Sequence, residues 1–211
     1  MDASTGARVV PTLLSPARAA TREKLIVAAL ELAEDGGYDA VGIRPVAARA
    51  GVSVPTAYQH VSSKDQLLVE ALMSLGARST EGVRQRPPAD SSPADRLMRV
   101  FRRVMKQAAA KPLLYSALYR AYVASGPLTA GAPDIAVGFG PERAAWIGET
   151  LRAGDHAGVE DADLEAAARI LSTLFLGAMV GLAAGRPSAE VLAVLDDATH
   201  RLLPETPRST T

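Results

Sequence analysis

Residues 51–64 constrain the fold of this chain more than any other segment, because residues that end and begin helices recur there at short spacing. Gly51 is suited to the left-handed turn that ends a helix. Ser53 is suited to cap the next helix, and Pro55 then falls in its first turn. The run Ser63-Lys64-Asp65-Gln66 has the spacing of a capping box at the start of another helix. The segment therefore predicts a short helix set between two others.

Two helices are predicted upstream of this segment. The first has Thr21 as its N-cap, a stripe of apolar residues from Leu25 to Ala33, and an end at Gly36-Gly37. The second covers residues 42–50 and has Pro45 in its first turn, where the missing N–H is not needed. Helices in this order, with a glycine turn before the short one, predict a helix-turn-helix.

Charge is distributed unevenly over this part of the chain. The formal net charge of the whole protein is zero, so a surface for nucleic acid has to come from local clustering of cations. From Ala40 to Lys64 there is no Asp or Glu, whereas Arg44, Arg49 and Lys64 are cationic. A polyanion can lie along such a surface without meeting a carboxylate. Among these cations, Arg49 is predicted to be a solvated helix charge rather than a DNA contact.

The composition excludes several classes of protein. The chain has no cysteine, which rules out a disulfide framework, a thiolate zinc site and a cysteine nucleophile. The N-terminus lacks the apolar stretch of a secretory signal. The apolar run Ile170–Ala184 is shorter than the roughly 20 residues that span a bilayer. We therefore expect a cytoplasmic protein with no membrane partner and no cofactor.

The remainder of the chain is predicted to be helical as well. Segments rich in Pro or Gly, at residues 85–92 and 125–140, separate its helices, and Ser92 and Ser188 are the expected N-caps. These helices are predicted at residues 92–111, 112–122, 141–153, 161–185 and 188–203. No strand pattern of useful length occurs, so the predicted fold class is all-α.

The helix-turn-helix resembles the DNA-binding domain of the TetR family of transcriptional repressors. The resemblance covers residues 21–75 and lies in Ala47, Ala50-Gly51-Val52-Ser53, Pro55-Thr56, Tyr58, His60-Val61, Lys64 and Leu67-Leu68. The chain departs from the family near Gly42, where a Thr is usual, and at Ala57 and Val61, where larger apolar residues are usual. These departures remove one phosphate contact and reduce the core of the domain.

Position within the motif indicates which side chains meet the DNA backbone. The N-terminal end of the recognition helix presents free N–H groups to phosphates. The hydroxyls of Thr56 and Tyr58, together with His60 and Lys64, suit phosphate contacts that set the register of this helix in the groove. For Tyr58 the alternative is an aromatic residue that only packs between domains.

Other side chains of the motif are suited to base edges. Gln59 can pair with adenine N6/N7, and Arg44 can pair bidentately with guanine O6/N7. Val54 and Pro55 are placed to pack against thymine methyl groups. The predicted DNA-binding residues are Arg44, Ser53, Val54, Pro55, Thr56, Tyr58, Gln59, His60 and Lys64.

Residues 1–20, which lack periodicity, are predicted to be a flexible arm, and the polar residues 206–211 a disordered tail. The resemblance implies a DNA-binding domain at residues 21–75 and a ligand-binding and dimerisation domain at 76–205. In the larger domain Tyr115, Tyr119 and Tyr122 recur at i, i+4 and i+7, and apolar walls with a few hydroxyls suit a hydrophobic ligand. The scarcity of buried charge argues against a highly charged effector, although each large apolar residue is also a candidate for ordinary core. The predicted pocket residues are Phe101, Met105, Tyr115, Tyr119, Tyr122, Trp146, Phe175 and Met179.

A homodimer interface is predicted near the C-terminus. Gly177 and Gly181 are spaced by four, which gives the helix 161–185 a smooth face that another helix can approach closely. With Leu192 and Leu195 of the last helix, this face is expected to form a C2 interface, an arrangement that the resemblance also implies. Two recognition helices of such a dimer would read a palindromic site.

The layout from Leu97 onward is also similar to the repressors of cholesterol and steroid catabolism in actinobacteria. The similar residues are Phe101-Arg102-Arg103-Val104, Leu118-Tyr119-Arg120-Ala121 and Gly177 to Gly185. This similarity favours a lipid, steroid or acyl-CoA ligand. The function implied is a ligand-responsive DNA-binding regulator, a repressor that a hydrophobic small molecule releases from double-stranded operator DNA.

Two other functions compete with this one. An enzyme is not favoured, because His60, His156 and His200 lie in different elements without metal-ligand spacing, and no catalytic triad or carboxylate pair is present. The acidic run at residues 155–163 is better explained by a solvated loop and a helix start than by a cation site. The other alternative is a dimeric helical ligand-binding or partner-binding module without specific DNA binding, which would tolerate carboxylates within residues 40–64.

Overall fold

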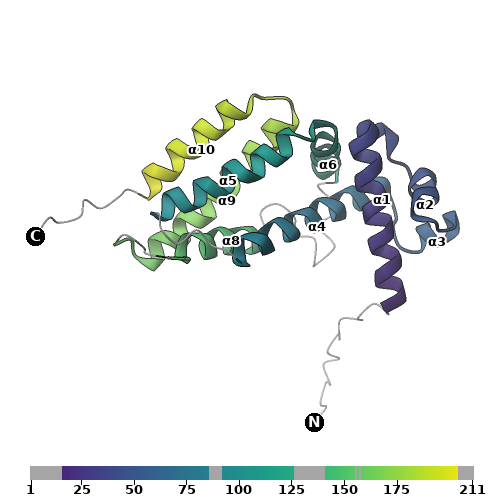
Figure 1. The fold of residues 1–211 in the computed structure, drawn as a ribbon, viewed down its shortest axis with the longest axis horizontal. Coiled ribbons are helices and arrows are strands. Elements are labelled where there is room, and N and C mark those ends of the chain that lie inside the picture. The colour runs from purple at the N-terminus through teal and green to yellow at the C-terminus, as the bar shows by residue number, and fades with distance from the viewer. Residues whose placement is uncertain (1–15, 86–91, 126–140, 155, 157, 204–211) are drawn as a thin grey trace, which may run out of the picture.

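The computed structural model describes residues 16–85, 92–125, 141–154, 156 and 158–203, and within these ranges the chain forms helices joined by turns, without a strand (Figure 1). The predicted all-α class is confirmed. In chain order the helices are α1 (Pro16–Ala40), α2 (Ile43–Ala50), α3 (Val54–Tyr58), α4 (Lys64–Gln85), α5 (Pro93–Ala109), α6 (Pro112–Ala124), α8 (Pro141–Arg152), α9 (Asp161–Ala183) and α10 (Ser188–Leu202).

Helix α1 begins earlier than the sequence predicted. It starts at Pro16, a residue that suits a first turn, and the Thr21 hydroxyl donates to the carbonyl oxygen of Ala17 at 3.0 Å. Thr21 is therefore inside the helix and is not its N-cap, and residues 16–20 of the predicted flexible arm are helical. The rest of that arm and the predicted tail lie outside the described residues. The predicted break at Gly36-Gly37 is confirmed, since neither glycine is helical and Gly37 has φ 68°.

The turn between α2 and α3 has the geometry that its sequence predicts. Gly51 ends α2 in left-handed backbone with φ 68° and ψ 31°, and its N–H donates to the carbonyl oxygen of Ala48 at 3.2 Å. The Ser53 hydroxyl accepts the N–H of Thr56 at 3.2 Å, which confirms the N-cap of α3. The two caps fix the direction in which α3 leaves the turn.

We predict that Gly51→Ala lowers the free energy of unfolding by about 1–2 kcal/mol, the cost of left-handed backbone for a residue with a Cβ. A Cβ at position 51 would have no heavy atom within 4 Å, so this cost is conformational and not steric. Gly76→Ala is the matched control: Gly76 also has open space but lies inside α4, where alanine is expected to add up to about 1 kcal/mol. Urea unfolding followed by circular dichroism measures both changes, and a shift of the same sign in both would contradict the prediction.

Helix α4 begins with half of the predicted capping box. The N–H of Gln66 donates to Ser63 Oγ at 3.1 Å, but Gln66 Oε1 accepts from the N–H of Ser62 at 3.0 Å instead of returning to Ser63. The helix then continues to Gln85, so the predicted domain boundary between residues 75 and 76 falls inside it. In Figure 1, α4 runs from the end of the molecule that carries α1–α3 towards α5 and α8.

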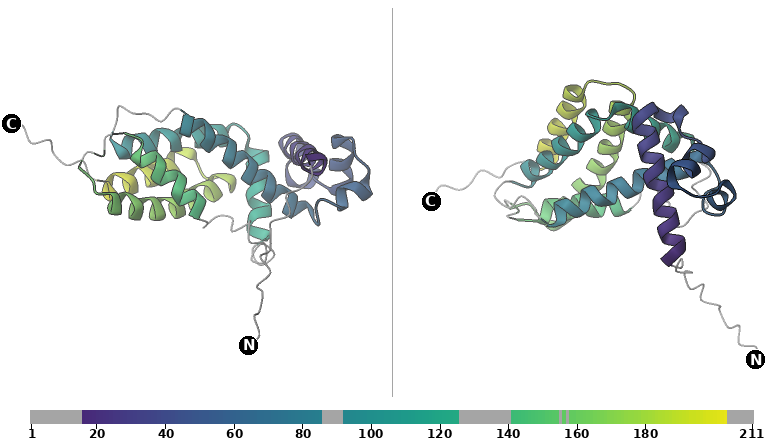
Figure 2. Two further views of the ribbon diagram at one scale, coloured as in Figure 1. Left: turned by 90° about the horizontal axis from the view of Figure 1, so that it is seen from below. Right: turned by 45° about the vertical axis from the view of Figure 1, so that its right-hand side comes forward.

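Helices α5, α6, α8, α9 and α10 form a bundle, and α4 packs on its helices α6 and α8 (Figure 2). The start of α5 is as predicted, because Ser92 Oγ accepts the N–H of Asp95 at 3.2 Å and Pro93 takes the first helical position. The N-cap predicted at Ser188 is wrong: Pro187 occupies that position, and Ser188 is the first residue of α10. Within the bundle α6 packs on both α1 and α4, so it joins the bundle to the helices that flank α2 and α3.

The bundle contains a buried cation that sequence reasoning missed. Arg96 on α5 is fully buried and donates to the end of α8, from Nη2 to the carbonyl oxygen of Leu151 at 2.5 Å and from Nε to that of Thr150 at 3.4 Å. Carbonyls in the last turn of a helix lack intrahelical donors, and a cation there is favoured by the helix dipole. The expectation of little buried charge in this domain is therefore corrected at Arg96.

Helix α9 is long and apolar enough to cross a membrane, which corrects the shorter span estimated from Ile170–Ala184. That property rests on length and composition alone, and the central helix of a soluble protein shares it. Here α9 packs against α5, α6, α8 and α10. It contributes to the core through Leu164, Ala167, Ala168, Leu171, Phe175, Leu176 and Met179.

Candidate nucleic-acid interface

A small apolar core holds α2 and α3 together. Ala57 and Val61 point inward and are buried, as predicted, and they share this core with Val46 and Ala47 of α2. Gly42 is the N-cap of α2 and provides no side-chain hydrogen bond in place of the Thr usual nearby. Because the inward face of α3 is fixed in this way, Pro55 and Tyr58 are exposed, whereas Val54 is half-buried and packs against the core.

The predicted DNA-binding residues divide into two groups by exposure. Arg44, Ser53, Pro55, Tyr58 and Gln59 are exposed, and Val54, Thr56, His60 and Lys64 are half-buried. Tyr58 is 59% exposed, so packing within the protomer does not explain this aromatic side chain. The hydroxyls of Ser53 and Thr56 hydrogen-bond each other at 2.7 Å, which orients Thr56 but occupies part of its bonding capacity.

Two arginines near this surface are held by carboxylates. Arg22 pairs with Glu70, at 2.5 Å from Nη2 and 3.0 Å from Nε, and its Nη1 donates to the carbonyl oxygen of His60 at 3.3 Å. Arg22 therefore fixes the end of α3 to α1 and α4, a role the sequence did not indicate. Arg49 is exposed, as predicted, and it also lies 3.3 Å from both Glu31 and Asp35 of α1, which makes it a link between helices.

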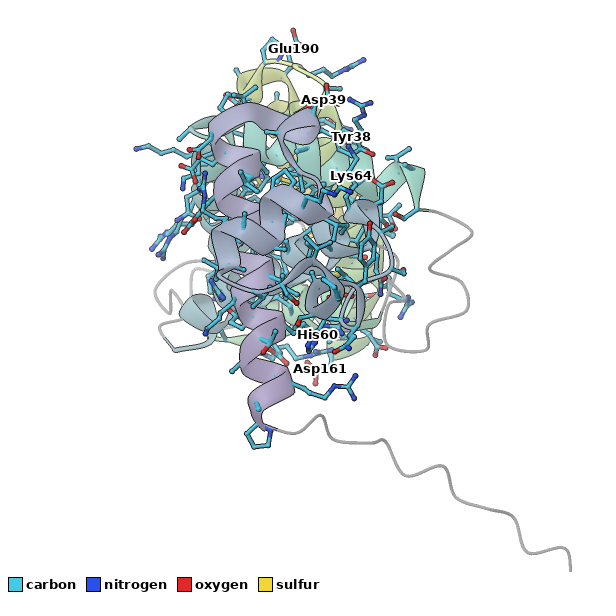
Figure 3. The ribbon with its side chains drawn as sticks, turned by 90° about the vertical axis from the view of Figure 1, so that its right-hand side faces the viewer. Tyr38, Asp39, His60, Lys64, Asp161 and Glu190 are labelled. Carbon is cyan, nitrogen blue, oxygen red and sulfur yellow. The ribbon has the colours of Figure 1, made fainter. Side chains whose placement is uncertain are left out.

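Lys64 lies beside an aromatic residue that sequence reasoning did not single out (Figure 3). Its Nζ is 3.7 Å from the centre of the Tyr38 ring and 3.5 Å from the carbonyl oxygen of Tyr38. The Tyr38 hydroxyl donates to Asp65 Oδ1 at 2.6 Å, and Arg120 Cζ of α6 is 4.0 Å from the same ring centre. The hydrogen bond to Asp65 and, to a smaller extent, burial raise the pKa of Tyr38 above its ordinary value of 10.0. The phenol therefore stays protonated and continues to donate this hydrogen bond.

Three of the eight predicted pocket residues, Phe101, Trp146 and Phe175, form an aromatic cluster inside the bundle. The rings of Phe101 and Phe175 stack with centroids 4.7 Å apart, and Trp146 lies 6.4 Å from the first and 6.0 Å from the second. Tyr119 and Tyr122 contact each other edge to face at 6.2 Å, and Met105 and Met179 are buried. The indole Nε1 of Trp146 is buried and has no hydrogen-bond partner within the described residues. An indole N–H in this condition is able to donate to a ligand oxygen.

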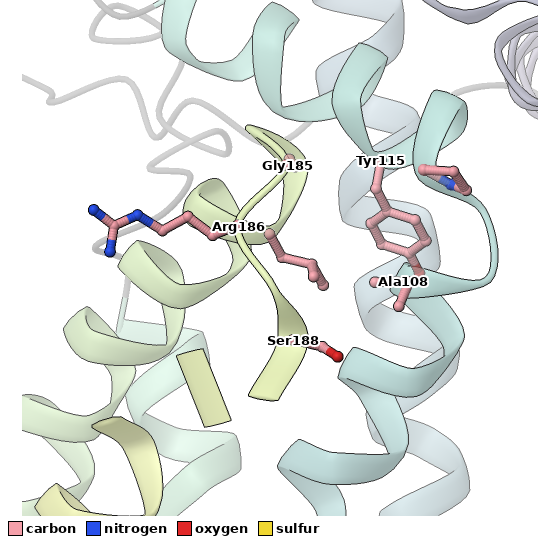
Figure 4. A pocket seen from close by; sticks show the side chains of 9 residues that line it. Ala108, Tyr115, Gly185, Arg186 and Ser188 are labelled. Carbon is pink, nitrogen blue, oxygen red and sulfur yellow. The ribbon is translucent and has the colours of Figure 1, made fainter. Parts of the chain in front are cut away.

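A separate pocket of about 230 Å³ opens between the α5–α6 turn and the α9–α10 turn (Figure 4). Of the predicted pocket residues only Tyr115 lines it, beside Ala108, Gly185, Arg186 and Ser188. Burial raises the pKa of the Tyr115 phenol above 10.0, with the Lys111 cation acting in the opposite direction. Tyr115 thus lies at this pocket, whereas Tyr119 of the same helix is buried.

The residues predicted to form the dimer interface do not all lie on the surface of the protomer. Leu195 is fully buried in the protomer and cannot contact a partner, because Val191, Leu195 and Thr199 form the inward face of α10. This part of the predicted interface is wrong. A Cβ on Gly181 would meet Val191 of α10 at 3.5 Å, so this glycine serves packing within the protomer.

Other residues of α9 and α10 leave an apolar face uncovered in the protomer. Gly177 is exposed, and a Cβ added to it would have no heavy atom within 4 Å; Leu192 is half-buried. On the same two helices, Ile170, two turns before Gly177, is 48% exposed, and Val194 is 61% exposed on the side of α10 away from Leu192. A face of this kind is available to a second copy of the chain.

Known proteins resemble this chain in the motif and over most of its length. Residues 25–71, which cover the helix-turn-helix, match the family described as "Bacterial regulatory proteins, tetR family". The transcriptional repressor KstR of Rhodococcus jostii is 31% identical over 194 residues, covering 90% of this chain and 86% of that protein.

Solved structures show the same fold over most of the chain. A TetR transcriptional regulator from Rhodococcus sp. RHA1 superimposes with a TM-score of 0.66 at 24% identity, covering 89% of this chain and 98% of that one. The FadR repressor of Thermus thermophilus, solved with lauroyl-CoA, gives a TM-score of 0.58 at 24% identity and covers 90% and 100% of the two chains. The similarity therefore extends beyond the helix-turn-helix into the bundle.

Proposed function

This chain belongs to the TetR family of bacterial regulatory proteins, and we propose that it represses transcription from a palindromic operator until a hydrophobic ligand releases it. The family consists of DNA-binding transcription regulators, and the chain is not an enzyme. We place its action in the cytoplasm, where bacterial DNA is found. The domains proposed are a reader at residues 21–75, called the reader domain below, and an effector domain at 76–205.

One observation carries the DNA-binding part of the proposal. The turn at Gly51 and the cap at Ser53 direct the exposed side chains Tyr58 and Gln59 outward, with Arg44 exposed on the neighbouring helix. No carboxylate occurs between residues 40 and 64, and the first one beyond, Asp65, already accepts the Tyr38 hydroxyl. A phosphate backbone can therefore approach α2 and α3 without meeting a carboxylate of these two helices.

The ligand part of the proposal rests on the bundle. In this proposal the effector binds against the stacked Phe101 and Phe175 rings and the adjacent Trp146, which are buried and apolar. The Trp146 N–H, which has no acceptor within the described residues, provides one donor for a ligand oxygen. We propose a mostly apolar effector with a carbonyl or hydroxyl oxygen. Its binding would favour a dimer geometry in which the two recognition helices no longer fit successive major grooves.

The test of the function is fluorescence anisotropy with duplex DNA from the region upstream of the protein's own gene, repeated over a salt series. We expect the logarithm of the association constant to fall linearly with the logarithm of the salt concentration. The slope should be about −0.9 for each phosphate neutralised. A protein that binds no DNA at low salt, or binds with affinity independent of salt, would instead support the alternative of a helical ligand- or partner-binding module.

A pair of substitutions tests the roles of individual residues. Lys64→Ala is expected to weaken binding to all sequences alike and to reduce the salt slope by about 1 for each subunit, because it removes a phosphate contact. Gln59→Ala is expected to relax preference at one base pair per half-site by about 1–3 kcal/mol, with an unchanged salt slope. Competition binding on a panel of single-base operator variants measures both. Uniform weakening by Gln59→Ala would show that Gln59 does not read a base.

A further inference from the structure

Tyr38 occupies the junction between the reader domain and the effector domain. Its ring centre is 3.7 Å from Lys64 Nζ, at the start of α4, and 4.0 Å from Arg120 Cζ, on α6. Its hydroxyl is held by Asp65 at 2.6 Å. A single side chain thus contacts both the residue proposed to bind phosphate and a helix of the bundle. Cations over an aromatic ring are attracted by its quadrupole, so both contacts are favourable.

We propose that Tyr38 is a positioning residue through which α6 sets the position of Lys64 for its phosphate contact. This inference rests on the proposed function, since it concerns the regulation of the same DNA surface. The Lys64 ammonium has three donors, and the contact with the Tyr38 carbonyl oxygen uses one of them. The others are left for a phosphate, and the ring restricts the otherwise flexible lysine in advance of binding.

Other contacts tie α6 and the turn before it to the same part of α1. Lys111 Nζ lies 2.8 Å from Glu34, and Arg120 Nη1 lies 3.8 Å from Asp39. At the break in α1, a Cβ added at Gly37 would lie 3.7 Å from Leu113 of α6. These contacts couple α6 to the part of α1 that carries Tyr38, so a displacement of α6 is transmitted to the Tyr38 ring. Through the ring it alters the surroundings of Lys64.

The test is a double-mutant cycle on DNA affinity that combines Arg120→Gln with Lys64→Ala. Arg120 is 60% exposed in its pair with Asp39, so its replacement leaves the core intact. With Lys64 present, Arg120→Gln is expected to weaken DNA binding by roughly fivefold for a dimer that loses two cation–π contacts. With Lys64→Ala, the same change is expected to have almost no effect, because the residue that it positions is gone.

Two further variants define the role of the ring. Tyr38→Leu should remove the effect of Arg120→Gln, whereas Tyr38→Phe keeps the ring and should retain most of it. Arg120→Lys should restore most of the affinity by keeping a cation over the ring. Arg102→Gln is the matched control, since Arg102 is a similarly exposed arginine of α5 that pairs with Asp196 of α10 at 2.7 Å, outside the contacts of Tyr38.

The outcomes separate this inference from the proposed function. If the wild-type protein binds DNA with a salt-dependent affinity but the effects of Arg120→Gln and Lys64→Ala on that affinity are additive, only the inference is overturned. Arg120 would then act independently of Lys64. An Arg120→Gln variant that binds as tightly as wild type overturns it as well. A wild-type protein that binds no DNA overturns both. If Tyr38→Leu does not fold, the cycle between the exposed Arg120 and Lys64 still decides the question.

Discussion

Val194→Asp is expected to convert the dimer into monomers and to weaken operator binding by about a hundredfold or more. Val194 is an apolar side chain of α10 that is 61% exposed in the protomer. In the proposed interface it faces a second copy across a two-fold axis, so each substitution places two carboxylates in one buried interface. Removing each charge from water into an apolar face costs several kcal/mol.

The loss of affinity follows from the loss of bivalency. A dimer that has docked one recognition helix presents the other at high effective concentration, and a monomer has only one half-site contact. Analytical ultracentrifugation measures the mass, and anisotropy measures the affinity. Val123→Asp is the matched control, because Val123 is 65% exposed on α6, outside α9 and α10. A Val194→Asp variant that remains dimeric would show that the interface lies elsewhere.

Arg96→Ala is expected to lower the free energy of unfolding by about 3–5 kcal/mol. The substitution leaves the carbonyl oxygens of Leu151 and Thr150 without their guanidinium donor, and it leaves a void where a fully buried side chain had been. For a chain of this size such a change lowers Tm by roughly 10 °C. The effector domain is expected to lose the most stability, because Arg96 joins its helices α5 and α8.

The control for this prediction lies on the same helix. Arg99→Ala removes an exposed arginine of α5 and is expected to change Tm by less than about 2 °C. Arg96→Met keeps the apolar volume of the side-chain stem, so its Tm is expected to lie between those of Arg96→Ala and Arg99→Ala. Differential scanning calorimetry measures all three variants. If Arg96→Ala lowers Tm no more than Arg99→Ala does, the free-energy cost of burying the guanidinium cancels the stability that its hydrogen bonds contribute.

Local chemistry explains which parts of this structure the sequence predicts. Gly51, Ser53 and Pro55 act on the backbone within a few residues of themselves, so their turn and caps follow from the sequence alone. Thr21 and Ser188 show the limit of such arguments. Both have the chemistry of a cap, but Pro16 starts α1 upstream of the first, and Pro187 takes the capping position before the second.

Contacts between distant segments were not predictable in this way. Arg96 looks like a surface residue in the sequence and becomes buried only because α8 ends against α5. Leu195 fits an apolar dimer face by composition, yet the rotation of α10 turns it into the protomer core and leaves Val194 outside. Tyr38 follows a glycine break and carries no motif. Its role is visible only when α4 and α6 are placed beside it.

Hydroxyl-radical footprinting of the wild-type protein on the DNA upstream of its gene tests the central claim most directly. A dimer that reads a palindrome through α3 is expected to protect two half-sites related by two-fold symmetry, with centres separated by about one helical turn or a multiple of it. The protection should weaken as salt is raised. Absence of protection at low salt, or a single unsymmetrical footprint, would contradict the account of this chain as a dimeric operator-binding regulator.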